Sequence, residues 1–129
     1  MKGLLDTHAF LWFDSEPARL SPAARAFCAD RNNVLFVSVA SVWELQIKVG
    51  YDKIDLRDPL AVIVRDQMQN GVTFLPVELA HVWALGGLPL HHKDPFDRVI
   101  IATAIAESAT IISADTAFAA YQPAASVLW

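Results

Sequence analysis

The sequence predicts an α/β protein, with a parallel sheet of about five strands between two layers of helices, in a single domain over residues 1–129. Short apolar runs typical of buried strands alternate along the chain with longer segments of helical character. Strands separated by helices pair in parallel through right-handed crossovers, which place helices on both faces of the sheet. A chain of this length can bury roughly two-thirds of the surface of its unfolded form, which is enough for one domain.

The chain opens with a strand and two helical segments. Residues 2–5 form a short apolar run, and residues 9–13 continue with helical character until Glu16-Pro17 interrupts them. Ser21-Pro22 has the form of an N-cap followed by Pro at the first helical position. This pair predicts a helix that runs to about Arg31.

A buried strand and a helix form the next unit. Asn32-Asn33 is typical of a turn, and the continuous apolar run at residues 34–37 is typical of a buried strand. We expect the following helix to begin at Ser38 or Ser41 and to end near Gly50.

A helix, a weaker strand and a short helix follow. Asp58-Pro59 repeats the pattern of a cap followed by Pro, and Asn70-Gly71 ends the helix that it opens. Residues 72–77 predict a third strand, which is imperfect because Pro76 has no amide proton for a sheet hydrogen bond. A short helix is expected over residues 78–85, where a pair of glycines stops it.

The last third of the chain contains the longest predicted helix and two strands. Asp94-Pro95 begins the helix, which runs to about Ser108. A fourth strand is expected at residues 110–113, and a fifth at residues 126–128. No repeat, low-complexity stretch or internal linker interrupts this alternation.

Composition restricts the class of protein. The single Cys28 cannot form an internal disulfide, which fits a reducing cytosol. There is no cationic, apolar leader and no apolar run near the roughly 18 residues of a membrane span, so a cytoplasmic protein is expected. Hydrophobic residues make up 54% of the chain, an excess that favours self-association as a homodimer. The net charge of −4 at first argues against a nucleic-acid partner. If a metal ion neutralises the clustered acids described next, the charge of the rest of the chain is near balance.

Four acidic residues lie where strand-like runs give way to helix-like runs. They are Asp6, Glu44, Asp97 and Asp115. In a parallel sheet these junctions lie at one edge, outside the carboxyl ends of the strands, where open α/β sheets bind ligands. Clustered carboxylates raise one another's pKa unless a cation neutralises them, and hard oxygen ligands select Mg²⁺ or Mn²⁺. The usual chemistry of such a site is phosphodiester hydrolysis by metal-activated water.

Each acid also has a purely structural explanation. Asp94 is a good N-cap, and Asp97 lies in the first turn of the same helix, where the helix dipole favours a carboxylate. Glu44 follows Ser41 at the spacing of a capping box, while Asp6 and Asp115 can cap the helices that follow them. Caps are needed wherever helices begin, however, whereas these four acids share one predicted edge.

Several motifs together resemble the PIN domain family and, more narrowly, the VapC-type toxins of bacterial toxin–antitoxin pairs. The motifs are Leu4-Leu5-Asp6-Thr7-His8, Ser41-Val42-Trp43-Glu44-Leu45, His92-Lys93-Asp94-Pro95-Phe96-Asp97-Arg98 and Ser113-Ala114-Asp115. The resemblance covers essentially the whole chain. It implies the strand order 3-2-1-4-5 and a Mg²⁺- or Mn²⁺-dependent endoribonuclease that is held inactive by a small antitoxin protein.

The resemblance also implies roles for the acids. Asp6, Glu44 and Asp97 correspond to the three core acids of the family, and Asp115 to the more variable fourth. All four are expected to be catalytic residues and metal ligands. Asp94 is carried over only as an outer residue of the metal site or as an N-cap.

Other polar residues near the predicted edge have two interpretations each. The Thr7 hydroxyl can hold a water or a substrate phosphate, or it can cap a helix; Arg98 can bind the scissile phosphate or pair with Asp94. His92 lies near the acids and can touch RNA, but His8, His81, His91 and His92 lack the spacing of a zinc site.

The four tryptophans also have two interpretations. The simplest places Trp12, Trp43, Trp83 and Trp129 in the core. The alternative is that Trp12 lines a groove for an antitoxin helix.

Three other functions compete with the nuclease. A phosphatase of similar topology needs a second acid two residues after the first, where this chain has His8, and a receiver domain needs an Asp after a middle strand, where it has Ser38. The third is a catalytically inactive PIN-like module that binds RNA or a protein. Retention of all four acids argues against it, since a lost site has no reason to keep repelling carboxylates together.

Overall fold

A five-stranded parallel sheet in the order β3-β2-β1-β4-β5 forms the centre of the computed structural model, which describes all residues 1–129. All four strand pairs are parallel. The strands are β1 (Lys2–Leu5), β2 (Val34–Ser38), β3 (Thr73–Leu75), β4 (Thr110–Ile112) and β5 (Ser126–Leu128). The predicted fold class and strand order are both confirmed.

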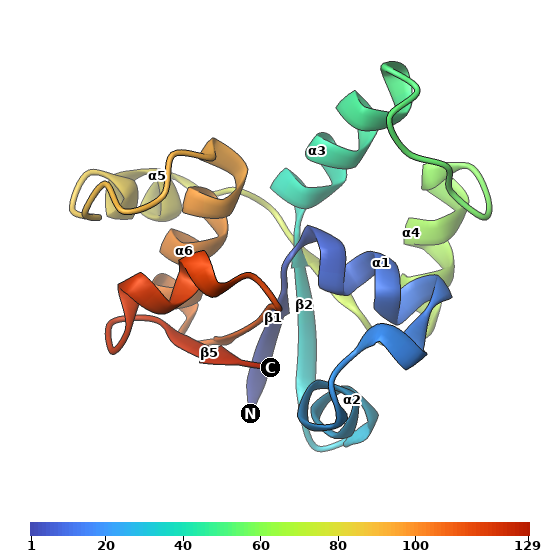
Figure 1. The fold of residues 1–129 in the computed structure, drawn as a ribbon, viewed down its shortest axis with the longest axis horizontal. Coiled ribbons are helices and arrows are strands. Elements are labelled where there is room, and N and C mark those ends of the chain that lie inside the picture. The colour runs from blue at the N-terminus through green and yellow to red at the C-terminus, as the bar shows by residue number, and fades with distance from the viewer.

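Helices cover both faces of this sheet (Figure 1). The α-helices are α1 (Thr7–Ser15), α2 (Pro22–Ala29), α3 (Val39–Gly50), α4 (Leu60–Gln69), α5 (Leu79–Leu85) and α6 (Pro95–Glu107), and the 3₁₀ helices are η1 (Pro17–Arg19) and η2 (Thr116–Tyr121). In Figure 1, α1, α2 and α4 lie on one side of the strands, and α5 and α6 lie on the other. No helix is both long enough and apolar enough to cross a membrane.

Two buried clusters, one on each face of the sheet, form the core. Successive residues of β1 point to opposite faces, because side chains alternate along a strand. Leu5 belongs to a cluster with Phe10 and Leu45, which connects the sheet to α1 and α3. Leu4 belongs to the other cluster, with Ile100 of α6. The central strand is therefore buried on both sides, as a parallel sheet requires.

The order of the strands creates a crevice beside β1. The chain adds β2 and β3 on one side of β1 and then returns to place β4 on the other side. Leu5 pairs in register with Val37 of β2 and with Ile112 of β4, so the three strands end at the same edge. An open α/β sheet binds ligands at this kind of switch point.

Gly3 is required by the packing of α2 on β1. A Cβ atom at this position would overlap Cε1 of Phe27. The aromatic ring occupies the space that any other side chain would need, so a larger residue must displace the Phe27 ring.

Several boundaries differ from the predictions. The helix expected to be capped by Asp58 begins at Leu60, with Pro59 as its N-cap, because the Asp58 carboxylate pairs with Arg57 instead. The third strand is confined to residues 73–75, since Pro76 cannot extend the ladder. The 3₁₀ helix η2 was not predicted.

The prediction that all four tryptophans lie in the core was wrong for three of them. Trp43 is 63% exposed and Trp83 is 70% exposed, and Trp129 is 37% exposed. Only Trp12 packs against a core cluster, and it does so from a partly buried position. α3 and α5 therefore present large apolar side chains to solvent.

Candidate metal centre

The four predicted acids all lie at the carboxyl edge of the sheet. Asp6 directly follows β1, Asp115 lies just beyond β4, and Asp97 is in the first turn of α6. Glu44 lies one turn into α3, which follows β2. Asp6, Glu44 and Asp94 each raise the pKa of Asp97, and Asp115 raises that of Asp6. The structure thus places Asp97 near Asp6 and Glu44, and Asp6 near Asp115.

Asp6 is the most restrained of the acids. Its Oδ1 atom accepts a hydrogen bond from the backbone N–H of Ala9 at 2.8 Å, so it caps α1, and its Oδ2 atom accepts one from the Ser113 hydroxyl. Its side chain is almost fully buried, and burial raises its pKa despite these hydrogen bonds. The cap and the site position are therefore compatible, because a carboxylate has lone pairs for both.

Glu44 is held between two partners. The Thr7 hydroxyl donates to Oε1 at 2.6 Å, and the Lys48 ammonium lies 2.8 Å from Oε2. The Thr7 oxygen also lies 3.0 Å from the Ser41 hydroxyl. Because the single Thr7 proton goes to the carboxylate, Ser41 donates to Thr7. This chain fixes the direction of Glu44 across two elements.

The structure corrects two interpretations at this point. Ser38, not Ser41, caps α3, so Glu44 is not part of a capping box. Thr7 neither caps a helix nor faces the solvent: its side chain is buried, and its proton is committed to Glu44. The Thr7 hydroxyl therefore positions Glu44 in this structure, and its contact with a substrate stays a prediction.

Asp97 is the acid most affected by its neighbours. Burial and then the Asp94 carboxylate raise its pKa from 3.8 to about 7, with His92 acting in the opposite direction. His92 Nε2 lies 2.9 Å from Asp97 Oδ2, although the direction of its N–H does not meet hydrogen-bond geometry. Asp97 is therefore a carboxylate whose negative charge the fold does not fully compensate.

His92 is brought into the acid cluster by the loop before α6. Its Nδ1 atom accepts a hydrogen bond from the backbone N–H of Asp94 at 3.3 Å, so Nε2 carries the proton in the neutral ring. One ligand atom each from His92, Asp97 and Asp115 lie within 4.8 Å of one another. No pattern in the sequence predicts that this imidazole lies between two acids.

Asp115 and Asp94 both cap helices. Asp115 Oδ1 accepts from the backbone N–H of Ala117 at 2.9 Å, which leaves Oδ2 directed towards His92 at 3.8 Å. Asp94 Oδ1 accepts from the backbone N–H groups of Phe96 and Asp97, as its N-cap interpretation expected.

Arg98 has a structural role in this conformation. Its Nη1 atom donates to the Pro89 carbonyl at 2.9 Å and lies 3.3 Å from the Tyr121 hydroxyl. It makes no ion pair with Asp94, so that alternative is not observed. The guanidinium instead ties the loop before α6 to η2.

The donor set fits a hard divalent cation. The converging groups are carboxylates together with the His92 imidazole, and carboxylate oxygens bind Mg²⁺ and Mn²⁺. The raised pKa of Asp97 is the physical sign of the fit, because a cation would remove the repulsion that keeps the proton on this acid. Asp6, Glu44, Asp97 and Asp115 are the residues that would hold it.

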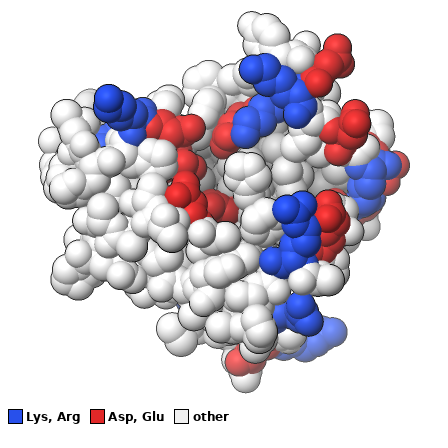
Figure 2. Space-filling view, viewed as in Figure 1, with Lys and Arg blue, Asp and Glu red and all other residues white.

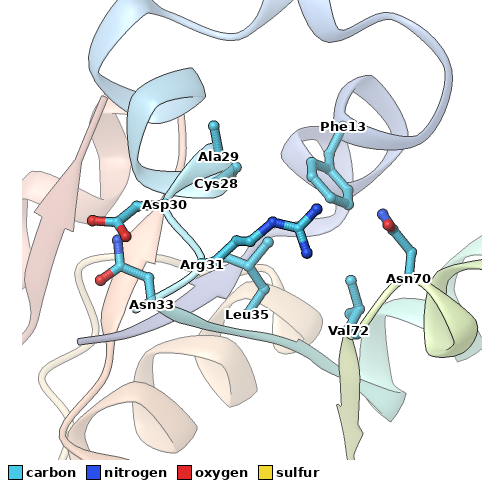
Figure 3. A pocket seen from close by; sticks show the side chains of 10 residues that line it. Phe13, Cys28, Ala29, Asp30, Arg31, Asn33, Leu35, Asn70 and Val72 are labelled. Atoms are coloured by element: carbon cyan, nitrogen blue, oxygen red, sulfur yellow. The ribbon is translucent and has the colours of Figure 1, made fainter.

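The acidic cluster is also visible on the surface of the molecule. Figure 2 shows acidic side chains gathered in a depression between α3 and α6, with Lys and Arg side chains on both sides of it. A separate hollow of about 400 Å³ lies at the opposite edge, before β2 and β3, where Arg31 points towards Phe13 (Figure 3). That second hollow brings together no cluster of acids.

Sequence reasoning missed the residues that support the acids. Lys48 follows Glu44 by four positions, a helical spacing that predicts such a pair. Ser113, by contrast, meets Asp6 only because β1 and β4 are neighbours, and no local pattern signals that contact.

Comparison by sequence identifies one protein family. A family model for the PIN domain matches residues 3–122. No curated protein matches the chain.

Solved structures with the same fold cover almost the whole chain. VapBC2 from Rickettsia felis, bound to a DNA fragment from its promoter, has a chain with TM-score 0.73 and 18% identity that covers 100% of this chain and 99% of its own length. VapBC-5 from Mycobacterium tuberculosis, a member of a family of toxin–antitoxin systems, has TM-score 0.61 and 23% identity over 98% and 95% of the two chains. VapBC-1 from nontypeable Haemophilus influenzae has TM-score 0.64 and 17% identity over 99% and 97%. These similarities establish the fold.

Proposed function

The chain belongs to the PIN domain family, and from this premise we propose that it is a Mg²⁺- or Mn²⁺-dependent endoribonuclease and the toxin of a toxin–antitoxin pair. The observation that carries the proposal is the crowding of Asp97 by Asp94, Asp6 and Glu44. A fold that gathers uncompensated carboxylates around one partly buried acid is less stable unless a cation binds there. Hydrolysis of RNA phosphodiester bonds is the chemistry that such a site supports best.

Each acid has a distinct role in this proposal. Asp6 is fixed by Ala9 and Ser113, so it provides a ligand with little freedom of direction. Glu44 is directed by Thr7 from across the site. A bound Mg²⁺ or Mn²⁺ supplies Lewis-acid activation of water and stabilisation of the charge on the leaving oxygen. The protein contributes position, since acids held before the reaction need no reorganisation during it.

No side chain of the cluster is arranged as a nucleophile with a base. The hydroxyl of Ser113 donates to Asp6, and that of Thr7 donates to Glu44, so both protons are committed to carboxylates. Cys28 lies on α2, and burial raises its pKa to about 11, which disfavours the reactive thiolate. Water is therefore the proposed nucleophile.

We also propose two protein partners. The structural neighbours are VapBC complexes of toxin–antitoxin systems, which supports a small antitoxin as one partner. The exposed apolar side chains of α3 and α5, including Trp43 and Trp83, support self-association as a homodimer. Large exposed apolar patches mark such interfaces.

The competing function is a PIN-like module that binds RNA or protein without cleaving it. This function requires the same fold, but it does not explain why hydrogen bonds fix the side chains of Asp6 and Glu44. One experiment separates the two functions: end-labelled single-stranded RNA is incubated with the protein in Mg²⁺, in EDTA, and with Asp6→Ala in Mg²⁺. Cleavage by the wild type in Mg²⁺ alone supports the nuclease, and cleavage that continues in EDTA excludes the proposed mechanism.

A further inference from the structure

A hollow adjoins the acid cluster on the side of α1. It has a volume of about 450 Å³ and is lined by Asp6, His8, Trp12, Arg19, Ala114 and Asp115. Its size is within the range of sites that hold a small ligand. Two of the four acids form one end of it, and cationic and aromatic side chains form the other.

Arg19 is the cation of this hollow. Its Cζ atom lies 4.7 Å from the centre of the Trp12 ring, so the guanidinium stacks on the indole. Its one acidic partner, Glu16, lies 3.6 Å away, and both side chains are more than half exposed, at 57% and 58%. Such a pair is weak and competes little with another anion. The stack holds the planar donors of Arg19 in place without satisfying them.

Arg19 differs in this respect from Lys48 and Arg98, two other basic groups near the acids. Lys48 is paired with Glu44 at 2.8 Å, and Arg98 donates to the Pro89 carbonyl. Lys48 cannot bind a phosphate without weakening its pair with Glu44, and the Nη1 atom of Arg98 is already occupied. Arg19, whose one ionic partner is distant and exposed, can therefore bind a phosphate beside the acids.

Aromatic rings line the same side of the site. His8 and Trp12 are four residues apart on α1 and lie on one face of the helix, with ring centres 6.1 Å apart. Trp129 meets Trp12 at 5.6 Å with the planes at 53° and remains 37% exposed. Exposed rings beside a cationic group are the usual means of binding single-stranded nucleic acid, since every base can stack on them.

We propose that this hollow binds the nucleotide next to the scissile phosphate of a single-stranded RNA, with Arg19 on its backbone phosphate and the His8 ring against its base. The inference rests on the proposed ribonuclease function and assigns it a substrate subsite. Because the contacts are to a phosphate and to a ring face, the subsite adds affinity without selecting a sequence.

Binding is tested separately from cleavage. The Asp97→Asn protein, in Mg²⁺, is titrated into a fluorescently labelled 12-nucleotide RNA, and anisotropy is measured at several salt concentrations. Adding Arg19→Ala is expected to lower the affinity about three- to tenfold and to reduce the slope of log affinity against log salt by about 0.7, the value for one phosphate contact on a single strand. Arg31→Ala removes an equal charge at the opposite edge of the sheet and is the matched control; it should change neither quantity.

Kinetics on the otherwise wild-type protein give a second measurement. Arg19→Ala should raise KM with kcat nearly unchanged. The subsite lies beside the reacting atoms, so its contacts are the same in the bound substrate and in the transition state. Arg19→Lys should keep the salt slope, since the charge remains, but lose part of the affinity, since Lys cannot stack as a plane on Trp12.

The outcomes distinguish the subsite from the proposed function. If Arg19→Ala binds RNA with the wild-type slope and affinity while the wild type cleaves RNA, the subsite is wrong and the ribonuclease stands. If the wild type never cleaves RNA but its binding depends on Arg19, the subsite stands and the enzymatic function falls. Loss of binding to a co-expressed antitoxin, with RNA binding unchanged, would overturn the subsite in favour of a protein partner.

Discussion

Replacing Asp97 with Asn should stabilise the metal-free protein and abolish its activity. The substitution keeps the shape of the side chain and removes its charge. In the folded protein, burial and the neighbouring Asp94 raise the pKa of Asp97 from 3.8 to about 7. Above that pH the fold must hold an ionised group that it disfavours. The variant is free of this penalty, whereas it lacks a charged ligand for the cation.

The size of the effect follows from the pKa. One unit corresponds to about 1.4 kcal/mol, so the full shift of Asp97 sets an upper limit of about 4 kcal/mol. The side chain is 19% exposed, and solvent screening reduces the expected gain to about 1–2 kcal/mol. A favourable charge near the start of α6 offsets about 0.3–1 kcal/mol of this. A net gain of about 1 kcal/mol, or about 3–6 °C in Tm, is expected at pH 8.

The gain should depend on pH in a defined direction. Between about pH 4 and pH 7 the folded chain keeps the Asp97 proton, whereas the unfolded chain loses it near pH 3.8. The folded state therefore binds more protons, and the wild type loses stability as the pH rises through this window. The amide of the Asp97→Asn variant does not titrate, so the Tm difference between variant and wild type should be near zero at pH 4 and largest above pH 7.

Thermal unfolding followed by circular dichroism in EDTA measures this difference. Asp55→Asn, an identical change at an exposed position, is the control and should show no such pH dependence. A variant less stable than the wild type by about 0.5–1 kcal/mol at pH 8, with cleavage retained, would show that Asp97 is not a strained metal ligand. Asp97 would then be only a helix-start carboxylate.

Three further predictions concern the position of Glu44, the packing at Gly3 and the oligomeric state. Thr7→Val should lower kcat at least about tenfold with little change in KM, because Glu44 loses the hydrogen bond that directs it, a contact of about 1.5–3 kcal/mol. Steady-state RNA cleavage measures both constants, and an unchanged kcat would show that Lys48 alone positions Glu44. Gly3→Ala should lower the free energy of unfolding in urea by about 1–3 kcal/mol, because its methyl group meets Phe27. Gly50→Ala is the control and should not lower it, because a Cβ there meets no atom within 4 Å. Equal effects of the two substitutions would contradict the close packing of Phe27 on Gly3. Light scattering at tens of micromolar protein should give the mass of a dimer. Trp43→Lys should reduce this mass, because Trp43 is 63% exposed on α3. A monomer mass for the wild type would exclude self-association.

The fold was predictable because its signals are local. Proline after a capping residue marks the starts of α2 and α6, and apolar runs mark β1 and β2. Asp6 and Asp115 could be placed at one edge because every parallel strand ends there. The 3₁₀ helix η2 gives no comparable signal, since its short run of Ala and aromatic residues has no helical stripe.

The details of the site depend on contacts between distant segments. The sequence allows either Ser38 or Ser41 to cap α3, and only the packing of α1 against α3 commits Ser41 to Thr7. The position of His92 between Asp97 and Asp115 depends on how the loop before α6 returns to the sheet. The exposure of Trp43 depends on which face of α3 meets the core, a choice that apolar residues on both faces leave open.

Direct measurement of Mn²⁺ binding tests whether the converging carboxylates form a divalent-metal site. Electron paramagnetic resonance of free Mn²⁺ reports the bound fraction without any RNA, so it does not depend on the identity of the substrate. The wild type and Asp55→Asn should bind Mn²⁺ alike, and Asp97→Asn should bind it at least about tenfold more weakly, since one charged ligand is lost. Equal binding by all three proteins, or binding by none, would contradict the account.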